Sequence, residues 1–155
     1  LFPDNFFDAV YSVTVLEECD AQKSIAEIKR VLKPGGVAGI VVRALDVPQW
    51  WNIKVSDSVN KIISVPPHMV SQKGVADMSL YEKIKLANFK NILSYPFWFT
   101  ASSGNNSYIY DMYYGRARQL LNNKQQEEFD KEIKNVNEKS QSILSVPLHC
   151  CIGYK

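Results

Sequence analysis

Two glutamates and a histidine are the side chains best suited to proton transfer. Glu17 and Glu18 follow an apolar run, and His68 lies in a long irregular segment. Carboxylates and imidazoles are common general acids and bases. A structural interpretation is simpler for all three. The glutamates would be solvated acids at a helix entry, where the helix dipole favours them, and a loop histidine is most often hydrogen-bonded or at the surface. His149, in the last apolar segment, is interpreted as structural.

Aromatic residues are the second group that could take part in a functional site. Trp50 and Trp51 follow an apolar segment, and Tyr81 and Tyr110 lie on segments with helical spacing. Such rings could form the wall of an apolar pocket or hold a cation. Ordinary core packing explains them equally well, and a helical stripe is more often core than a binding site.

The first 45 residues have the pattern of a strand, a helix and a second strand. Phe6–Leu16 is nearly continuously apolar, which predicts a strand buried on both faces. The helix begins either after Asp20 or, with a glutamate three residues on, at Ser24. Pro34–Gly36 ends the helix, and Val37–Ala44 is the second strand. The two strands should be parallel, with a right-handed crossover.

The rest of the chain is predicted to form a loop region, a helix, an aromatic strand, a turn, a helical segment and a last strand. In chain order these are Asp46–Asp77, Ser79–Asn88, Ile92–Ser102, Gly104–Asn106, Ser107–Ser140 and Ile143–Tyr154. Pro96 predicts an edge position or a bulge for the aromatic strand.

Composition limits the classes of partner. The net charge of +2 is too small to indicate nucleic acid or an anionic membrane. No apolar run reaches the ~20 residues that span a bilayer. The three cysteines form no Cys-x-x-Cys pair, so we expect no metal site and reduced thiols in a cytoplasmic protein.

Two segments carry a resemblance to a known family. The opening LFPDNFFDAVYSVTVLEE resembles a strand and its entry turn in class I S-adenosylmethionine-dependent methyltransferases. The segment IAEIKRVLKPGG resembles that family's E-x-x-R-V-L-K-P-G-G signature, from Glu27 to Gly36. Both segments in this order and spacing resemble the second half of the domain, of the type 11-like kind.

The resemblance implies a fold, a cofactor and a site. The fold class would be α/β, the C-terminal half of a Rossmann-like domain, mostly parallel with an antiparallel final strand. Residues 1–45 would be the core, 46–78 a loop region, and 79–155 the remainder of a single partial domain, with Ser107–Ser140 as a helical insertion. Ser12, Val13 and Thr14 would pass beside the methionine part of S-adenosyl-L-methionine. A small hydrophobic or aromatic acceptor would approach Trp50, Trp51, Tyr81 and Tyr110.

The departures from the family pattern point to an incomplete site. The chain contains no G-x-G-x-G, and the acidic residues expected to hold the ribose and the adenine are absent. The family's V-L-E-H reads Val15–Glu18. We therefore expect the chain to be inactive alone and to require a missing N-terminal half or an oligomer. The alternative is a non-catalytic binding or partner subunit. A different Rossmann-like nucleotide enzyme has no positive support.

Overall fold

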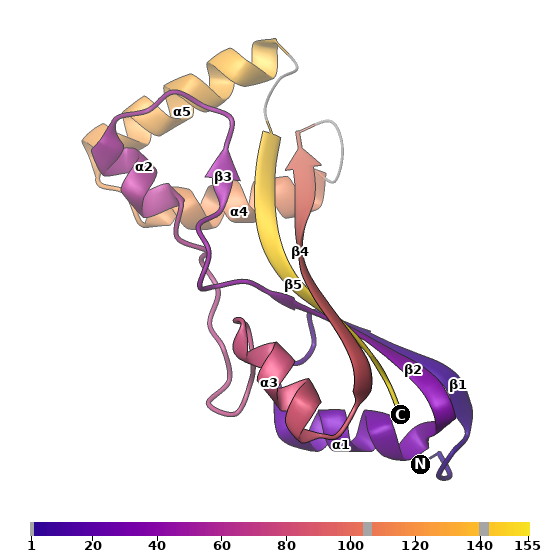
Figure 1. The fold of residues 1–155 in the computed structure, drawn as a ribbon. Helices are drawn as coiled ribbons and strands as arrows, with labels where there is room; N and C mark the ends of the chain where they lie inside the picture. The colour runs from indigo at the N-terminus through magenta and orange to yellow at the C-terminus, as the bar shows by residue number, and fades with distance from the viewer. Residues whose placement is uncertain (1, 104–106, 140–142) are drawn as a thin grey trace. The chain divides into compact units, whose positions relative to one another are not determined.

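The computed structural model describes residues 2–103, 107–139 and 143–155 (Figure 1). The predicted turn at Gly104–Asn106 lies outside these residues. The elements in chain order are β1 (Phe7–Val13), α1 (Ala21–Val31), β2 (Leu32–Arg43), β3 (Trp50–Trp51), α2 (Asp57–Ile63), α3 (Ser79–Leu86), β4 (Lys90–Ser102), α4 (Ser107–Gln119), α5 (Asn123–Glu138) and β5 (Ile143–Tyr154).

The chain forms two compact units. Unit 1 comprises Leu1–Asp46, Met69–Phe97 and Leu148–Lys155, and unit 2 comprises Val47–His68 and Trp98–Pro147. The long strands β4 and β5 each contribute residues to both units.

The strands pair as a mixed sheet in the order β1-β2-β5-β3, and β4 also pairs with β5. β1 runs parallel to β2, whereas β5 runs antiparallel to both β2 and β3. The expectation of a mostly parallel sheet is therefore wrong for the described residues, because β5 lies in the interior of the sheet and opposes two of its neighbours. The predicted antiparallel last strand is confirmed over its full length, Ile143–Tyr154.

The predicted βαβ unit is confirmed, with its helix starting at the earlier of the two candidate sites. The Asp20 carboxylate accepts a hydrogen bond from the Lys23 backbone N–H at 3.1 Å, which caps α1. The helix ends at Val31 with Leu32 as its C-cap, so the predicted stop at Pro34–Gly36 comes too late, and these three residues belong to the start of β2. Gly35 adopts a φ of 77°, a left-handed conformation that favours glycine. The chain then enters the regular part of β2, where Val37 to Val41 pair with Ala9 to Val13.

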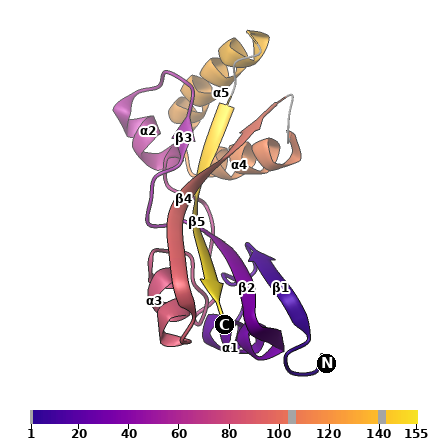
Figure 2. The same ribbon diagram turned by 45° about the vertical axis from the view of Figure 1, so that its right-hand side comes forward.

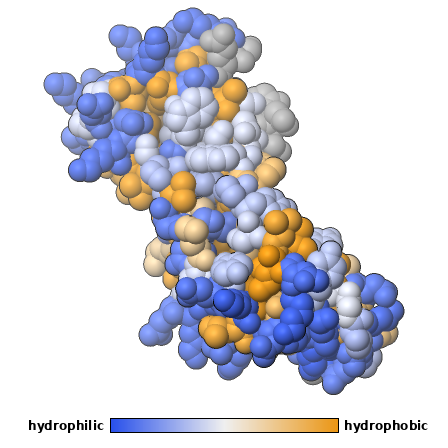
Figure 3. All heavy atoms as spheres, in the orientation of Figure 1, coloured by the Kyte–Doolittle hydropathy of each residue, from blue (hydrophilic) through white to orange (hydrophobic). Residues whose placement is uncertain are grey.

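β1 is not buried on both faces, so that expectation is wrong. Tyr11 is 84% exposed, and Phe6, Val13 and Val15 are also largely exposed. The reason is the position of β1: it ends the sheet order, and only one of its faces carries helices in the described part of the chain. Hydrophobic residues accordingly reach the surface over the strands of unit 1 (Figure 3).

The core of unit 1 lies on one side of its strands. Ile25 of α1 and Leu80 and Ile84 of α3 pack against Ile40 and Cys151 of the sheet. α1 and α3 lie side by side on this face (Figures 1 and 2). The predicted helix at Ser79 is confirmed as α3.

Unit 2 has its own core. Trp51, Tyr110, Phe129 and Leu144 are all buried together, with Trp51 edge-on to both Tyr110 and Phe129. The expected helical stripe divides into α4 and α5, because Asn122 and Gln125 form a capping box that starts a second helix. The long segment after β2, expected to be irregular, contributes β3 and α2.

Candidate functional site

An open groove borders the carboxyl-terminal half of β1. Residues of β1 and of the turn after it form one wall, and one face of α1 forms the other. The lining residues are Val10, Tyr11, Ser12, Val13, Val15, Leu16, Lys23, Ser24, Glu27 and Ile28. Ser12 and Val13, which the sequence predicts as cofactor contacts, thus lie in a groove at the strand end where open α/β sheets bind ligands.

Thr14, the third predicted cofactor contact, has an unusual backbone at the end of β1. Its φ is 52°, and its N–H donates to the Val41 carbonyl at 2.8 Å, which holds the strained residue against β2. Among the residues that the structure describes, the other non-glycine residues with positive φ are asparagines, which tolerate it. For a β-branched residue this conformation is an outlier, and such outliers cluster at functional sites.

Glu17 is buried rather than solvated, which overturns the simpler interpretation drawn from the sequence. It is 1% exposed. Its Oε1 accepts the Arg43 backbone N–H at 2.7 Å and lies 3.5 Å from the Arg43 guanidinium. Oε2 is buried and has no hydrogen-bond partner among the described residues. The carboxylate therefore joins the end of β1 to the end of β2.

A strap formed by residues 71–76 covers Glu17. The Ser71 N–H donates to the Glu17 carbonyl, the Val75 N–H donates to Leu16, and the Leu45 N–H donates to the Ala76 carbonyl. At Gly74 a Cβ atom would lie 2.3 Å from the Glu17 carbonyl oxygen, so only glycine fits this crossing. The strap explains why Glu17 is shielded from solvent and cannot serve as an accessible base. Glu18, by contrast, is exposed as expected of a solvated acid.

Asp46 and His149 form a pair in unit 1. His149 Nε2 lies 2.8 Å from Asp46 Oδ1, and Oδ2 accepts the Met78 N–H at 3.2 Å. Burial acts to raise the pKa of Asp46, but the hydrogen bonds from His149 and Met78 outweigh it, so the pKa lies below its usual value. The contact gives His149 a structural role, as predicted, because it ties β5 to the segment after β2.

His68 belongs to a hydrogen-bonded cluster in unit 2. Its Nε2 lies 2.7 Å from the Tyr113 hydroxyl, and its Nδ1 lies 3.0 Å from Arg116 Nη1. Because a guanidinium only donates, Nδ1 is the acceptor in that contact and Nε2 carries the proton. The arrangement fits the interpretation of a hydrogen-bonded loop histidine, and a role for His68 as a base stays a prediction.

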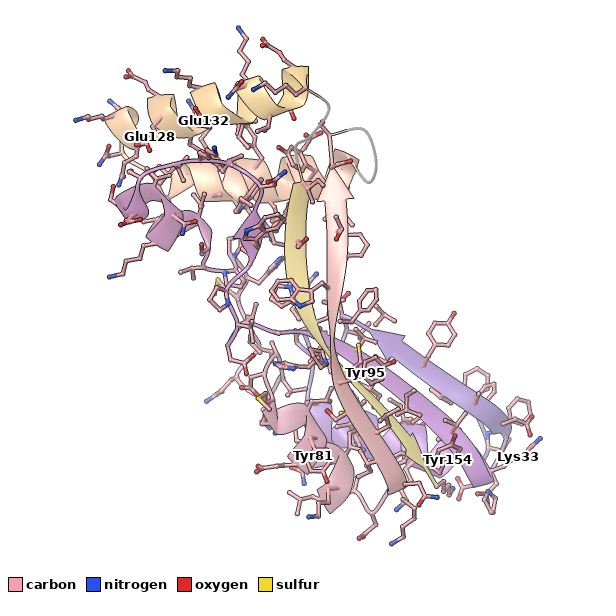
Figure 4. The ribbon with its side chains drawn as sticks, turned by 45° about the horizontal axis from the view of Figure 1, so that its top comes forward. Lys33, Tyr81, Tyr95, Glu128, Glu132 and Tyr154 are labelled. Carbon is pink, nitrogen blue, oxygen red and sulfur yellow. The ribbon has the colours of Figure 1, made fainter. Side chains whose placement is uncertain are left out.

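The four predicted acceptor contacts lie in different surroundings. Trp50 is half exposed on β3, and Tyr81 lies at the surface of α3 in unit 1 (Figure 4). Trp51 and Tyr110 are buried in the core of unit 2, where the Trp51 indole N–H donates to the Ile63 carbonyl at 3.1 Å. Burial favours core packing for these two, the alternative that the sequence left open.

Sequence reasoning missed the latch between Glu17 and Arg43 and the pair formed by Asp46 and His149. The register of β1 and β2 alone would place residue 43 near the turn that contains Glu17. The contact between Glu17 and Arg43 therefore had a weak signal in the sequence. The contact between Asp46 and His149 joins residues 103 positions apart, and no sequence pattern indicated it.

The described residues contain no group of three or more His, Cys, Asp or Glu side chains that could hold a metal ion. The groove at the end of β1 fits one part of the expected cofactor: it offers the Ser12 hydroxyl and a largely apolar β1 wall, opposite an α1 wall that carries Lys23 and Glu27. The strained Thr14 adjoins the groove in sequence but does not line it. The groove holds no equivalent of the missing glycine-rich loop.

Comparison with known proteins supports the resemblance over a limited segment. Residues 1–40 match the profile of the methyltransferase domain family. Forty residues are 55% and 48% identical to the sterol 24-C-methyltransferases ERG6A and ERG6B of Gibberella zeae. This match covers 25% of the chain and 10% of either relative, so most of each relative has no counterpart in the match.

A solved structure matches nearly the whole chain. A proposed methyltransferase from Bacillus halodurans superposes with a TM-score of 0.51 at 15% identity, covering 99% of this chain and 72% of that one. At this identity the likeness concerns the fold.

In the described part of the chain, no helix has the length and apolar character needed to cross a membrane.

Proposed function

We propose that this chain, whose residues 1–40 belong to the methyltransferase domain family, supplies part of the S-adenosylmethionine site of a methyltransferase. The observation that carries the proposal is the coincidence of Ser12, Val13 and the strained Thr14 at the carboxyl end of β1. A non-glycine residue held in this conformation costs about 1–3 kcal/mol, and such residues cluster at functional sites.

The groove supports a small, hydrophobic or aromatic acceptor. Val10, Tyr11, Val13 and Val15 make most of its β1 wall apolar. S-adenosylmethionine, when bound, supplies a methyl group already activated by a sulfonium charge. The chain would hold the donor at Ser12–Thr14 and exclude water, which is the main requirement for an in-line displacement.

A ligand titration of the 155-residue chain tests the site. S-adenosylhomocysteine is added at millimolar concentration to the 15N-labelled chain, and amide shifts are followed by NMR. We expect saturable shifts at Ser12, Val13 and Thr14. S-adenosylmethionine itself should bind at least 5-fold more weakly to Val15→Lys, because a lysine in the groove repels the sulfonium.

Val65→Lys is the matched control. Val15 and Val65 are 53% and 58% exposed, and Val65 lies outside the groove. Affinity should be unchanged in Val65→Lys. Shifts absent from the end of β1, or weakened equally by both variants, would reject the site. With a labelled methyl donor we expect no turnover by the chain alone, because the glycine-rich loop is absent.

A second candidate function is a non-catalytic binding subunit. The observation that favours it is the apolar sheet face of unit 1 that no described helix covers. Specific amide shifts at Ser12–Thr14 favour the first function, and their absence together with a defined oligomer favours the second.

A further inference from the structure

A second groove lies in unit 2, between α4 and α5. On α5 its lining residues run from Asp130 to Glu138 with the i, i+3, i+4, i+7 pattern, which places them on one face of the helix. On α4 it is lined by Tyr110, Asp111 and Tyr114. Its volume of about 470 Å³ suits a small molecule. This α4–α5 groove shares no residue with the groove at the end of β1.

Part of the lining of the α4–α5 groove is aromatic and apolar. Tyr110 and Ile133 are 2% and 6% exposed and belong to the core of unit 2. The Tyr114 ring stacks on Phe129 with the ring centroids 5.4 Å apart, and its hydroxyl donates to Asp130 Oδ1 at 2.7 Å. Burial and this hydrogen bond raise the pKa of Tyr114 to about 12, so the hydroxyl keeps its proton at neutral pH. These side chains offer a fixed surface to an apolar or aromatic ligand.

The charged residues of the lining make the groove acidic. Asp130 is compensated by Arg118, whose Nε lies 3.1 and 3.0 Å from the two carboxylate oxygens. Asp111, Lys134 and Glu138 also line the groove, and none of them forms an ion pair with any residue that the structure describes. Two unpaired carboxylates are thus set against one ammonium group. Such a lining attracts a cation more than an anion.

Asn137 adds a hydrogen-bond acceptor that has no donor. Its Oδ1 is buried and has no partner among the described residues. A side-chain amide oxygen accepts and cannot donate, and leaving it unpaired is costly. Because Asn137 lines the groove, an N–H group bound there can supply the missing hydrogen bond. A protonated amine is a cation that also donates an N–H, whereas a quaternary ammonium has none to donate.

We propose that the α4–α5 groove binds a small protonated amine with an aromatic or apolar body. The ammonium group donates to Asn137 Oδ1 beside the unpaired carboxylates, and the body packs against the two tyrosines and Ile133. This site is separate from the one proposed for the methyl donor, and neither depends on the other.

An NMR titration of the 15N-labelled chain with phenethylamine at pH 7 tests the proposal. We expect saturable amide shifts around Tyr114, Asp130 and Asn137. Two analogues keep the aromatic body: phenethyl alcohol lacks the charge, and the N,N,N-trimethyl derivative of phenethylamine lacks the N–H. Each should bind at least 5-fold more weakly, because each loses one of the two interactions.

Two variants remove these interactions from the protein. Asn137→Leu should weaken phenethylamine binding at least 5-fold, yet it should not lower the melting temperature of the chain, because it removes an unpaired buried oxygen. Glu138→Gln removes one unpaired carboxylate and should weaken binding at least 2-fold. Glu132→Gln is the matched control, since Glu132 lies on α5 outside the groove (Figure 4). Glu132→Gln should bind phenethylamine like the parent chain.

The proposal fails if phenethylamine gives no saturable shifts at the residues of the α4–α5 groove. It also fails if either analogue binds as tightly as phenethylamine, or if Glu132→Gln weakens binding as much as Glu138→Gln does. Shifts confined to the groove at the end of β1 would overturn it too, and would leave the proposed methyl-donor site unaffected.

Discussion

Glu17 and Glu18 are adjacent and chemically identical, yet the fold uses them differently. The Glu17 carboxylate is buried and accepts the Arg43 N–H, whereas Glu18 is exposed. A buried carboxylate is tolerated only where charge and hydrogen bonds compensate for lost hydration. Arg43 provides both to one oxygen, so the pair acts as a latch between two strand ends.

Replacement of each glutamate by alanine should separate these roles. Glu17→Ala leaves the Arg43 N–H and guanidinium without their partner, and should cost about 2 kcal/mol of unfolding free energy. Glu18→Ala should change it by less than about 0.5 kcal/mol. Urea unfolding followed by circular dichroism measures both, and equal losses would show that the latch contributes nothing.

At the scale of the element, the start of α1 is set by its N-cap residue. Asp20 caps the helix, and Ser24, the rival start, lies one turn inside it. The Ser24 hydroxyl lies 3.2 Å from the Cys19 sulfur and caps nothing.

Asp20→Ala should therefore destabilise the chain by about 1 kcal/mol through loss of the cap. Ser24→Ala should be neutral or slightly stabilising, because alanine is the better residue inside a helix. Thermal unfolding of the two variants alongside the parent chain gives the comparison. If Ser24→Ala were the more damaging change, the helix would begin a turn later than the structure shows.

Local pattern was sufficient for the elements whose contacts are local. The presence of α1 and the bounds of β5 follow from short-range residue types, whereas the sequence left the start of α1 open between Asp20 and Ser24. The expected stop at Pro34–Gly36 is also displaced, because α1 ends at Val31 and these residues belong to β2. The exposure of β1 did not, because an apolar strand has the same sequence whether or not a helix covers it. The burial of Glu17 also escaped prediction, since it depends on residues 71–76 crossing the strand ends.

Long-range contacts decide how much of the candidate site a sequence can reveal. Ser12 and Val13 could be named as cofactor contacts because a strand end is a local feature and the opening segment resembles a known family, and both line the groove. His149 and Asp46 meet across 103 residues, and no spacing rule brings them together. Trp51 and Tyr110 look equally suited to a pocket or a core, and only tertiary packing distinguishes the two.

The pair of Asp46 and His149 should give the stability of the whole chain a dependence on pH. Its hydrogen bonds hold the pKa of Asp46 below the usual value despite burial. A lowered folded-state pKa stabilises the fold above the unfolded-state value near 4, and this contribution is lost as pH falls through the folded-state pKa.

Asp46→Asn should accordingly melt below the parent chain at pH 7, and the difference should close below about pH 4. Melting temperatures at pH 7, 5 and 3 provide the measurement. A difference that stays constant down to pH 3 would mean that the carboxylate charge is irrelevant to the pair.

The central position of β5 in the sheet affects how the chain folds during its synthesis. β5 pairs with β2, β3 and β4, yet it follows β2 in the chain by roughly a hundred residues. A ribosome adds about 5–20 residues each second, so β2 waits roughly 5–20 seconds for that neighbour. During this interval its hydrogen-bonding edge and the apolar strands beside it are accessible to chaperones and to other nascent chains. Synthesis rate, as much as stability, should therefore govern how much of this chain reaches its native sheet.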